Sequence, residues 1–223
     1  MGQIISPLVA TLVRLFARFI TAVRGIWDGV APVDKQRIYY ANHASHGDFI
    51  LVWTALPPPL RRHTRPVAGA DYWLNGRLRS WLIRDVFKAV LVDRNADTRQ
   101  DDPIETMSQA LHSGDSLILF PEGTRNLGDQ PLQPFKSGLF HLAQACPEVE
   151  LVPVWIANLN RVMPKGEFVP IPLICTVTFG EPVALESGED KAAFLARASS
   201  ALERLSPDYE PAETTLDSTE SPS

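Results

Sequence analysis

The chain has 223 residues, of which 45% are apolar and 21% charged, the balance of one ordinary folded domain with a sizeable core. Five acids in a C-terminal tail without Lys or Arg account for the net charge of −5, so the nearly neutral body offers no footprint for nucleic acid. Cys146 and Cys175 each lie in an apolar segment, which favours buried thiols in a reducing compartment over a disulfide or metal site.

Residues 4–27 repeat apolar side chains with the spacing of an amphipathic helix that has a wide apolar face. Arginines in its middle argue against a transmembrane span, which needs about 20 nearly uncharged residues. They also interrupt the apolar core that a signal peptide would require. We predict that residues 1–28 form an interfacial helix, with the apolar face in lipid and the arginines toward anionic headgroups. A helix packed on its own domain is the alternative.

From Arg37 onward, apolar runs alternate with helical patterns. This alternation predicts an α/β fold over residues 29–206, with a mainly parallel sheet flanked by helices. The expected strands are 37–41, 66–69, 88–92, 116–120, 151–156 and 173–179. The expected helices are 48–56, 71–86, 102–112, 136–145 and 189–205. The basic run 60–65 is either a solvated loop or a contact to lipid or polyphosphate, and the acidic tail 207–223 is expected to be disordered.

The first stretch that could carry chemistry is the predicted turn after the apolar residues Ile38, Tyr39 and Tyr40. It places His43 five residues before Asp48, so that a carboxylate can lie behind an imidazole. By itself this spacing is weak evidence, because an aspartate at the start of a helix can serve simply as its cap.

The second stretch is the turn Pro121-Glu122-Gly123-Thr124-Arg125, which ends a predicted buried strand. Ligands bind at the carboxyl ends of strands in open α/β sheets. Gly123 allows close approach of the backbone to a ligand, and Arg125 offers a planar fork suited to phosphate. Lys136, at a predicted helix start, and Arg94, at the end of another strand, add to a candidate anion site.

Four blocks of the sequence resemble the signature blocks of the glycerolipid acyltransferases, the family that includes 1-acylglycerol-3-phosphate acyltransferase. The run Asn42-His43-Ala44-Ser45-His46-Gly47-Asp48 resembles the first block, and Phe120-Pro121-Glu122-Gly123-Thr124-Arg125 resembles the third. Arg94 falls where the second block has its arginine, and Leu151-Val152-Pro153-Val154 resembles the fourth. The blocks occur in the family's order and cover roughly residues 38–180.

The resemblance implies an O-acyltransferase that moves a fatty acyl group from acyl-CoA or acyl carrier protein to the free hydroxyl of a lysophospholipid. The favoured reaction converts 1-acylglycerol-3-phosphate to phosphatidate, without metal or prosthetic group, on a peripheral or monotopic protein at the cytoplasmic face of a membrane. Lys88 and Leu91 stand where the second block usually has Gly and Phe. Because that block is tied to acceptor binding, another lysophospholipid or glycerol-3-phosphate remains an alternative acceptor. Acyl chain length, the donor and the oligomeric state stay open.

The chemistry of these residue types fits acyl transfer. Attack of a hydroxyl on a thioester needs a base, and a neutral histidine such as His43 suits that role near neutral pH. Asp48 would fix the imidazole tautomer and stabilise the imidazolium. Arg94, the Glu122–Arg125 turn and Lys136 would hold a phosphate of the acceptor. Alternatively, Glu122 positions the turn through backbone N–H groups without contacting the ligand.

Three rival interpretations can be compared with this one, and the second of them is rejected. His43, His46 and Asp48 could contribute to a metal site, but the other histidines (His63, His112 and His141) show no ligand-like spacing. Gly114-Asp115-Ser116-Leu117 has the letters of a serine lipase signature, yet the only later histidine lacks the aspartate three residues before it. A non-catalytic lipid-binding member of the same fold is the third rival, and the intact site residues favour the enzyme.

Overall fold

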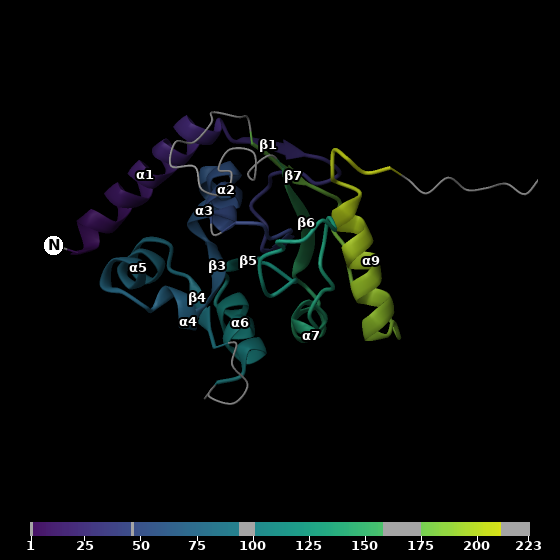
Figure 1. Ribbon diagram of the computed structural model, residues 1–223. Helices are drawn as coiled ribbons and strands as arrows, with labels where there is room; N and C mark the ends of the chain where they lie inside the picture. The colour runs from purple at the N-terminus through teal and green to yellow at the C-terminus, as the bar shows by residue number, and fades with distance from the viewer. Residues whose placement is uncertain (1, 46, 94–100, 158–174, 211–223) are drawn as a thin grey trace, which may run out of the picture.

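The computed structural model describes residues 2–45, 47–93, 101–157 and 175–210, which form a seven-stranded sheet with helices on both faces (Figure 1). The strand order is β1-β7-β6-β2-β5-β3-β4, and every neighbouring pair is parallel except β6 and β7. The predicted α/β fold with a mainly parallel sheet is therefore confirmed. The strands are β1 (Arg24–Trp27), β2 (Arg37–Ala41), β3 (Thr64–Gly69), β4 (Val90–Val92), β5 (Ser116–Leu119), β6 (Glu150–Ala157) and β7 (Thr176–Phe179).

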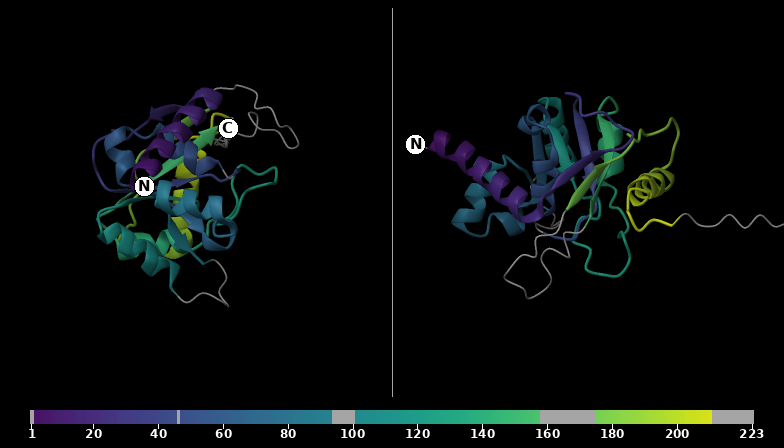
Figure 2. Two further views of the ribbon diagram at one scale, coloured as in Figure 1. Left: turned by 90° about the vertical axis from the view of Figure 1, so that its left-hand side faces the viewer. Right: turned by 90° about the horizontal axis from the view of Figure 1, so that it is seen from above.

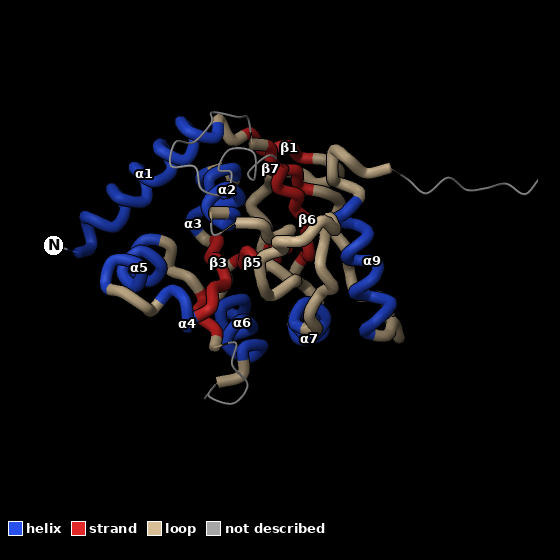
Figure 3. The backbone as a smooth tube through the Cα atoms, viewed as in Figure 1, coloured by secondary structure: helices blue, strands red, loops and turns tan. Residues whose placement is uncertain are grey.

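Two layers of helices cover the sheet, one on each face (Figure 3). Successive residues of a strand point to opposite faces, so Ile38 and Tyr40 of β2 pack against α6, α7 and α9, while Tyr39 packs toward α2 and η1. The helices are α1 (Gly2–Thr21), α2 (Asp48–Ala55), α3 (Pro58–Arg62), α4 (Ala70–Trp73), α5 (Arg77–Trp81), the π-helix η1 (Leu82–Val86), α6 (Pro103–His112), α7 (Gly138–Ala145) and α9 (Lys191–Glu203).

The N-terminal helix is shorter than the predicted helix over residues 1–28. The helix α1 ends at Thr21, and the next residue, Ala22, has a φ of +42°. Arg24–Trp27 then forms the edge strand β1, parallel to β7. Its apolar side chains continue the helical pattern in the sequence, but Trp27 stacks on Phe179 of β7 with ring centroids 4.1 Å apart. This packing on the sheet, together with strand pairing, overrides the local helical periodicity.

The helix α1 presents apolar side chains on two of its faces. Val9, Ala10 and Val13 pack against the core cluster on the α2 side of the sheet. The opposite face points away from the domain and exposes more than half of each of four large side chains: Leu8, Leu12, Leu15 and Phe16. Figures 1 and 2 show α1 on the outside of its helical layer. In the part of the chain that the structure describes, no helix has the length and apolarity to span a bilayer.

The predicted helix 71–86 is divided into α4, α5 and η1. The division falls at Gly76, whose φ of +116° is open to glycine and strained for other residues. As a result, the chain changes direction between α4 and α5, and side chains from both segments line the cavity described below. Of the predicted tail 207–223, residues 211–223 lie outside the described residues.

Candidate active site

The two turns that the sequence singles out lie side by side at one edge of the sheet. β2 and β5 are adjacent and parallel, with Tyr40 opposite Leu119. The chain therefore leaves both strands at the same edge, with His43 just beyond β2 and Pro121–Arg125 just beyond β5. This is the carboxyl edge, where open α/β sheets bind ligands.

Asp48 supports the imidazole of His43 from behind. Nδ1 of His43 lies 2.8 Å from Oδ2 of Asp48, and the same oxygen accepts hydrogen bonds from the backbone N–H groups of Ala44 at 2.7 Å and Ser45 at 2.8 Å. Asp48 is only 1% exposed and is the first residue of α2, where the helix dipole favours a negative charge. All three donors lie before α2, so the carboxylate holds the turn and the ring and does not act as a helix cap.

This arrangement leaves the other ring nitrogen of His43 available for proton transfer. When the Nδ1 proton points at Asp48, Nε2 carries the lone pair and can accept a proton. The ring is also stacked on Phe120, with centroids 4.2 Å apart and planes 20° apart. Phe120 is a site residue that could not be assigned from the sequence pattern. The clue in the sequence was an aromatic residue at the end of the strand that leads into the second turn.

Glu122 connects the second turn to the backbone of His43. Its side chain is buried, with 1% exposure; Oε1 accepts the N–H of His43 at 2.8 Å and Oε2 accepts the N–H of Gln133 at 2.9 Å. Burial raises the pKa of Glu122, and these two backbone N–H groups oppose the rise. The N–H of Asn126 in turn donates to the carbonyl of His43 at 2.6 Å. Glu122 therefore makes the backbone contacts of a positioning residue.

Asn42 is a second positioning residue that sequence reasoning missed. Its side-chain amide donates to the carbonyl of Ile156 at 3.1 Å and accepts the N–H of the same residue at 2.7 Å. The amide thereby takes the place of a backbone partner where β2 ends beside β6. The clue in the sequence was that Asn42 is the first residue of the first signature block.

A cavity of about 540 Å³ opens at His43, and it has a charged wall and an apolar wall. Gly123, Thr124, Arg125 and Lys136 all line it, together with Arg79 of α5, which the sequence analysis did not identify. Gly123 has a φ of +72°, and a Cβ there would lie 3.1 Å from Cγ of Lys136, so glycine lets the lysine stem cross the turn. Arg94 lies outside the described residues. The apolar wall comprises Phe49, Val67, Val92, Met107, Leu119 and Leu139.

Ser116, the nucleophile of the rejected lipase interpretation, lies away from this cavity. It begins β5, at the opposite edge of the sheet from His43, and is 5% exposed. Its hydroxyl oxygen accepts the N–H of Arg37 at 3.0 Å. Ser116 therefore connects two strands: its own N–H donates to the carbonyl of His63 at 2.6 Å, and its hydroxyl has no imidazole partner among the described residues.

Comparison with known proteins identifies the family. The Acyltransferase family model matches residues 28–157. A 1-acyl-sn-glycerol-3-phosphate acyltransferase of Limnanthes alba is 32% identical over 163 residues, covering 70% of this chain and 53% of the relative. The corresponding protein of Haemophilus influenzae is 28% identical over 147 residues, covering 58% and 55%. The chain thus spans about half the length of the curated relatives it matches.

The fold also matches a solved structure. The crystal structure of the 1-acyl-sn-glycerophosphate acyltransferase of Thermotoga maritima aligns with a TM-score of 0.66 at 20% identity, covering 91% of this chain and 82% of that one. Identity at that level supports a shared fold only. The match of the family model to more than half of the chain carries the assignment: this chain belongs to the Acyltransferase family.

Proposed function

We propose that the chain transfers a fatty acyl group from acyl-CoA or acyl carrier protein to the free hydroxyl of a lysophospholipid, with 1-acylglycerol-3-phosphate giving phosphatidate as the favoured reaction. The observation that carries the proposal is the cavity at His43, in which a supported imidazole, three cationic side chains and an apolar wall meet. The names of the matched relatives favour the same acceptor.

In the proposed reaction His43 acts as general base. Nε2 takes the proton of the acceptor hydroxyl as its oxygen attacks the thioester carbonyl, and Asp48 stabilises the imidazolium through Nδ1–H. The tetrahedral intermediate collapses, the carbon–sulfur bond breaks, and the imidazolium returns its proton to the leaving thiolate. The products are the new ester and the free thiol. The acceptor hydroxyl is the nucleophile, so the donor is the one co-substrate that this chemistry requires.

The cavity walls suit the two ends of a lysophospholipid. Arg125, Lys136 and Arg79 carry the positive charge that a phosphate monoester requires, and we also assign Arg94 to this group. The hydroxyl of Thr124 offers a further hydrogen-bond donor on the same wall. The apolar wall provides a place for an acyl chain.

We further propose that the outer face of α1 attaches the protein to the membrane surface. Leu8, Leu12, Leu15 and Phe16 follow the i, i+4, i+7, i+8 spacing of one helical face and are 52–66% exposed. Leu78 of α5 is also 68% exposed, and α1 packs beside η1, which continues α5. The packed and interfacial interpretations of this helix are thus compatible, because they use opposite faces.

A basic pair, Arg14 of α1 and Arg61 of α3, favours an anionic membrane. Burial and the nearby charge of Arg14 lower the pKa of Arg61, which also lies 5.2 Å above the ring of Trp53. An anionic headgroup would relieve the repulsion between the two arginines. Arg61 belongs to the basic run 60–65, for which contact with lipid was one of the two expectations. A cytoplasmic face, where anionic lipid gathers, is part of the proposal.

The first prediction concerns the general base. Changing His43→Ala removes the proton acceptor, so release of CoA from acyl-CoA with lysophosphatidate should fall roughly a hundredfold or more. His141→Ala, an exposed histidine on α7, is the matched control and should keep the wild-type rate. Equal rates for His43→Ala and wild type, or no release by wild type with any lysolipid, would refute the proposed function.

The second prediction concerns the acceptor phosphate. Lys136→Met keeps the stem that packs over Gly123 and removes the charge, so KM for lysophosphatidate should rise about tenfold or more. KM for a monoacylglycerol, which lacks the phosphate, should change little. Lys191→Met, at the start of α9, is the control and should leave both values unchanged. A KM that rises equally for both acceptors would contradict a phosphate contact.

The third prediction concerns the membrane face. The double substitution Leu12→Gln and Phe16→Gln should reduce co-flotation with phosphatidylglycerol vesicles about tenfold or more, because two apolar side chains no longer enter lipid. Leu127→Gln is the control, since Leu127 is 62% exposed but lies in the loop beyond the second turn. The thermal midpoint should stay the same in both variants. Undiminished flotation of the double variant would exclude this face as the attachment site.

A further inference from the structure

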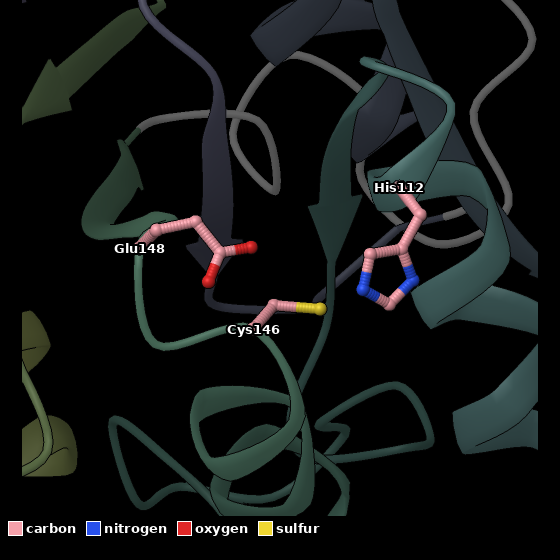
Figure 4. A group of neighbouring side chains, drawn as sticks. All are labelled: His112, Cys146 and Glu148. Atoms are coloured by element: carbon pink, nitrogen blue, oxygen red, sulfur yellow. The ribbon is translucent and has the colours of Figure 1, made fainter.

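A second group of polar side chains lies at the amino-terminal edge of the sheet, opposite the edge that carries His43. His112 is the last residue of α6, Cys146 follows the last turn of α7, and Glu148 lies in the turn that leads into β6. Their ligand atoms all lie within 4.8 Å of one another, and the three side chains converge (Figure 4). We propose that His112, Cys146 and Glu148 form a binding site for Zn²⁺, separate from the acyltransferase site.

The backbone fixes the spacing between two of the three proposed ligands. The N–H of Val149 donates to the carbonyl of Cys146 at 3.1 Å, which closes a turn with Pro147 at its second position. Proline presets the φ that this position of a turn requires. Cys146 and Glu148 are therefore held at the two ends of a short, stiff segment, on the side of α7 that meets α6.

A buried hydroxyl beside the sulfur gives independent support for a ligand at this place. Ser108 lies one turn before His112 on α6, so both side chains face the same direction. Its hydroxyl lies next to the Cys146 thiol and is 8% exposed as a residue. The hydroxyl interacts with the thiol closely enough to lower the pKa that burial raises, and it makes no hydrogen bond of normal geometry to any other group in the described part of the chain. It is placed to donate to a metal-bound thiolate, as groups behind metal ligands commonly do.

The donor set matches zinc better than the other common cations. One thiolate, one imidazole and one carboxylate are the ligands that Zn²⁺ takes, whereas Mg²⁺ and Ca²⁺ take oxygen ligands. Tetrahedral coordination would place neighbouring ligand atoms about 3.5 Å apart. The present separations, none above 4.8 Å, therefore need to close by little more than about an ångström at most. His112 and Glu148 are exposed and free to rotate, while Cys146 is buried and fixed.

The location indicates a stabilising role for the metal. The site would join the corner between α6 and β5 to the corner between α7 and β6, two segments far apart in the sequence. A ligand that binds the native state alone raises the temperature of unfolding. Histidine spacing gives no sign of such a site, because the cysteine and the glutamate come from a different helix–strand corner.

The test uses the metal-stripped full chain with a phosphine reductant. Titration with Co²⁺ should produce a thiolate-to-cobalt charge-transfer band, which Cys146→Ser should abolish and Cys175→Ser should retain. These are the two cysteines of the chain, so the pair assigns the sulfur. Zn²⁺ roughly a hundredfold above its dissociation constant should raise the wild-type thermal midpoint by about 5–10 °C.

Two further variants keep the test decisive if Cys146→Ser does not fold. His112→Ala and Glu148→Gln change exposed side chains, and each should weaken Zn²⁺ binding in calorimetry by at least about tenfold. His63→Ala, an exposed histidine elsewhere, should bind Zn²⁺ like wild type. Absence of the charge-transfer band in wild type, its persistence in Cys146→Ser, or wild-type affinity in both exposed variants would each overturn the proposal.

Discussion

A buried carboxylate connects the two turns on which the site is built. Glu122 accepts the N–H of His43 with one oxygen and the N–H of Gln133 with the other. Burying a carboxylate is unfavourable unless its oxygens are hydrogen-bonded, and burial does raise the pKa of Glu122. The two hydrogen bonds offset the cost of burial. They also tie the backbone of the proposed base to the turn that carries Arg125. Together with the N–H of Asn126, which donates to the carbonyl of His43, this connection holds the imidazole and the cationic wall in one unit.

The sheet supplies the frame for that connection. Parallel strands β2 and β5 bring both turns to one edge, and the amide of Asn42 joins the end of β2 to β6. The cavity at His43 combines positive charge with apolar surface, as an amphipathic acceptor requires. The exposed face of α1 would bring that cavity to the surface where such acceptors reside. Under the proposed function, the fold, the site and the membrane attachment would all serve one class of substrate.

Much of this arrangement was predictable from local patterns in the sequence. Alternating apolar runs identified the parallel α/β fold. The spacing of His43 and Asp48 was weak evidence for their pairing by itself and gained weight from the other signature blocks. The strand at Arg24–Trp27 was not predictable, because its apolar residues continue the period of α1 and only contact with β7 decides the outcome. The alternatives for Glu122 could not be separated either, since they differ in the direction of one buried side chain. His112 and Cys146 meet through tertiary packing, which local spacing does not encode.

The most direct test of the account is steady-state kinetics of Glu122→Gln with lysophosphatidate, alongside urea unfolding of the same protein. Glutamine keeps one acceptor oxygen and loses the other, so the free energy of unfolding should fall by about 1–3 kcal/mol. We expect kcat to fall roughly tenfold or more because the base is misplaced, while KM for the acceptor stays within about twofold. A wild-type kcat combined with a raised KM would make Glu122 a ligand of the acceptor and would contradict the account.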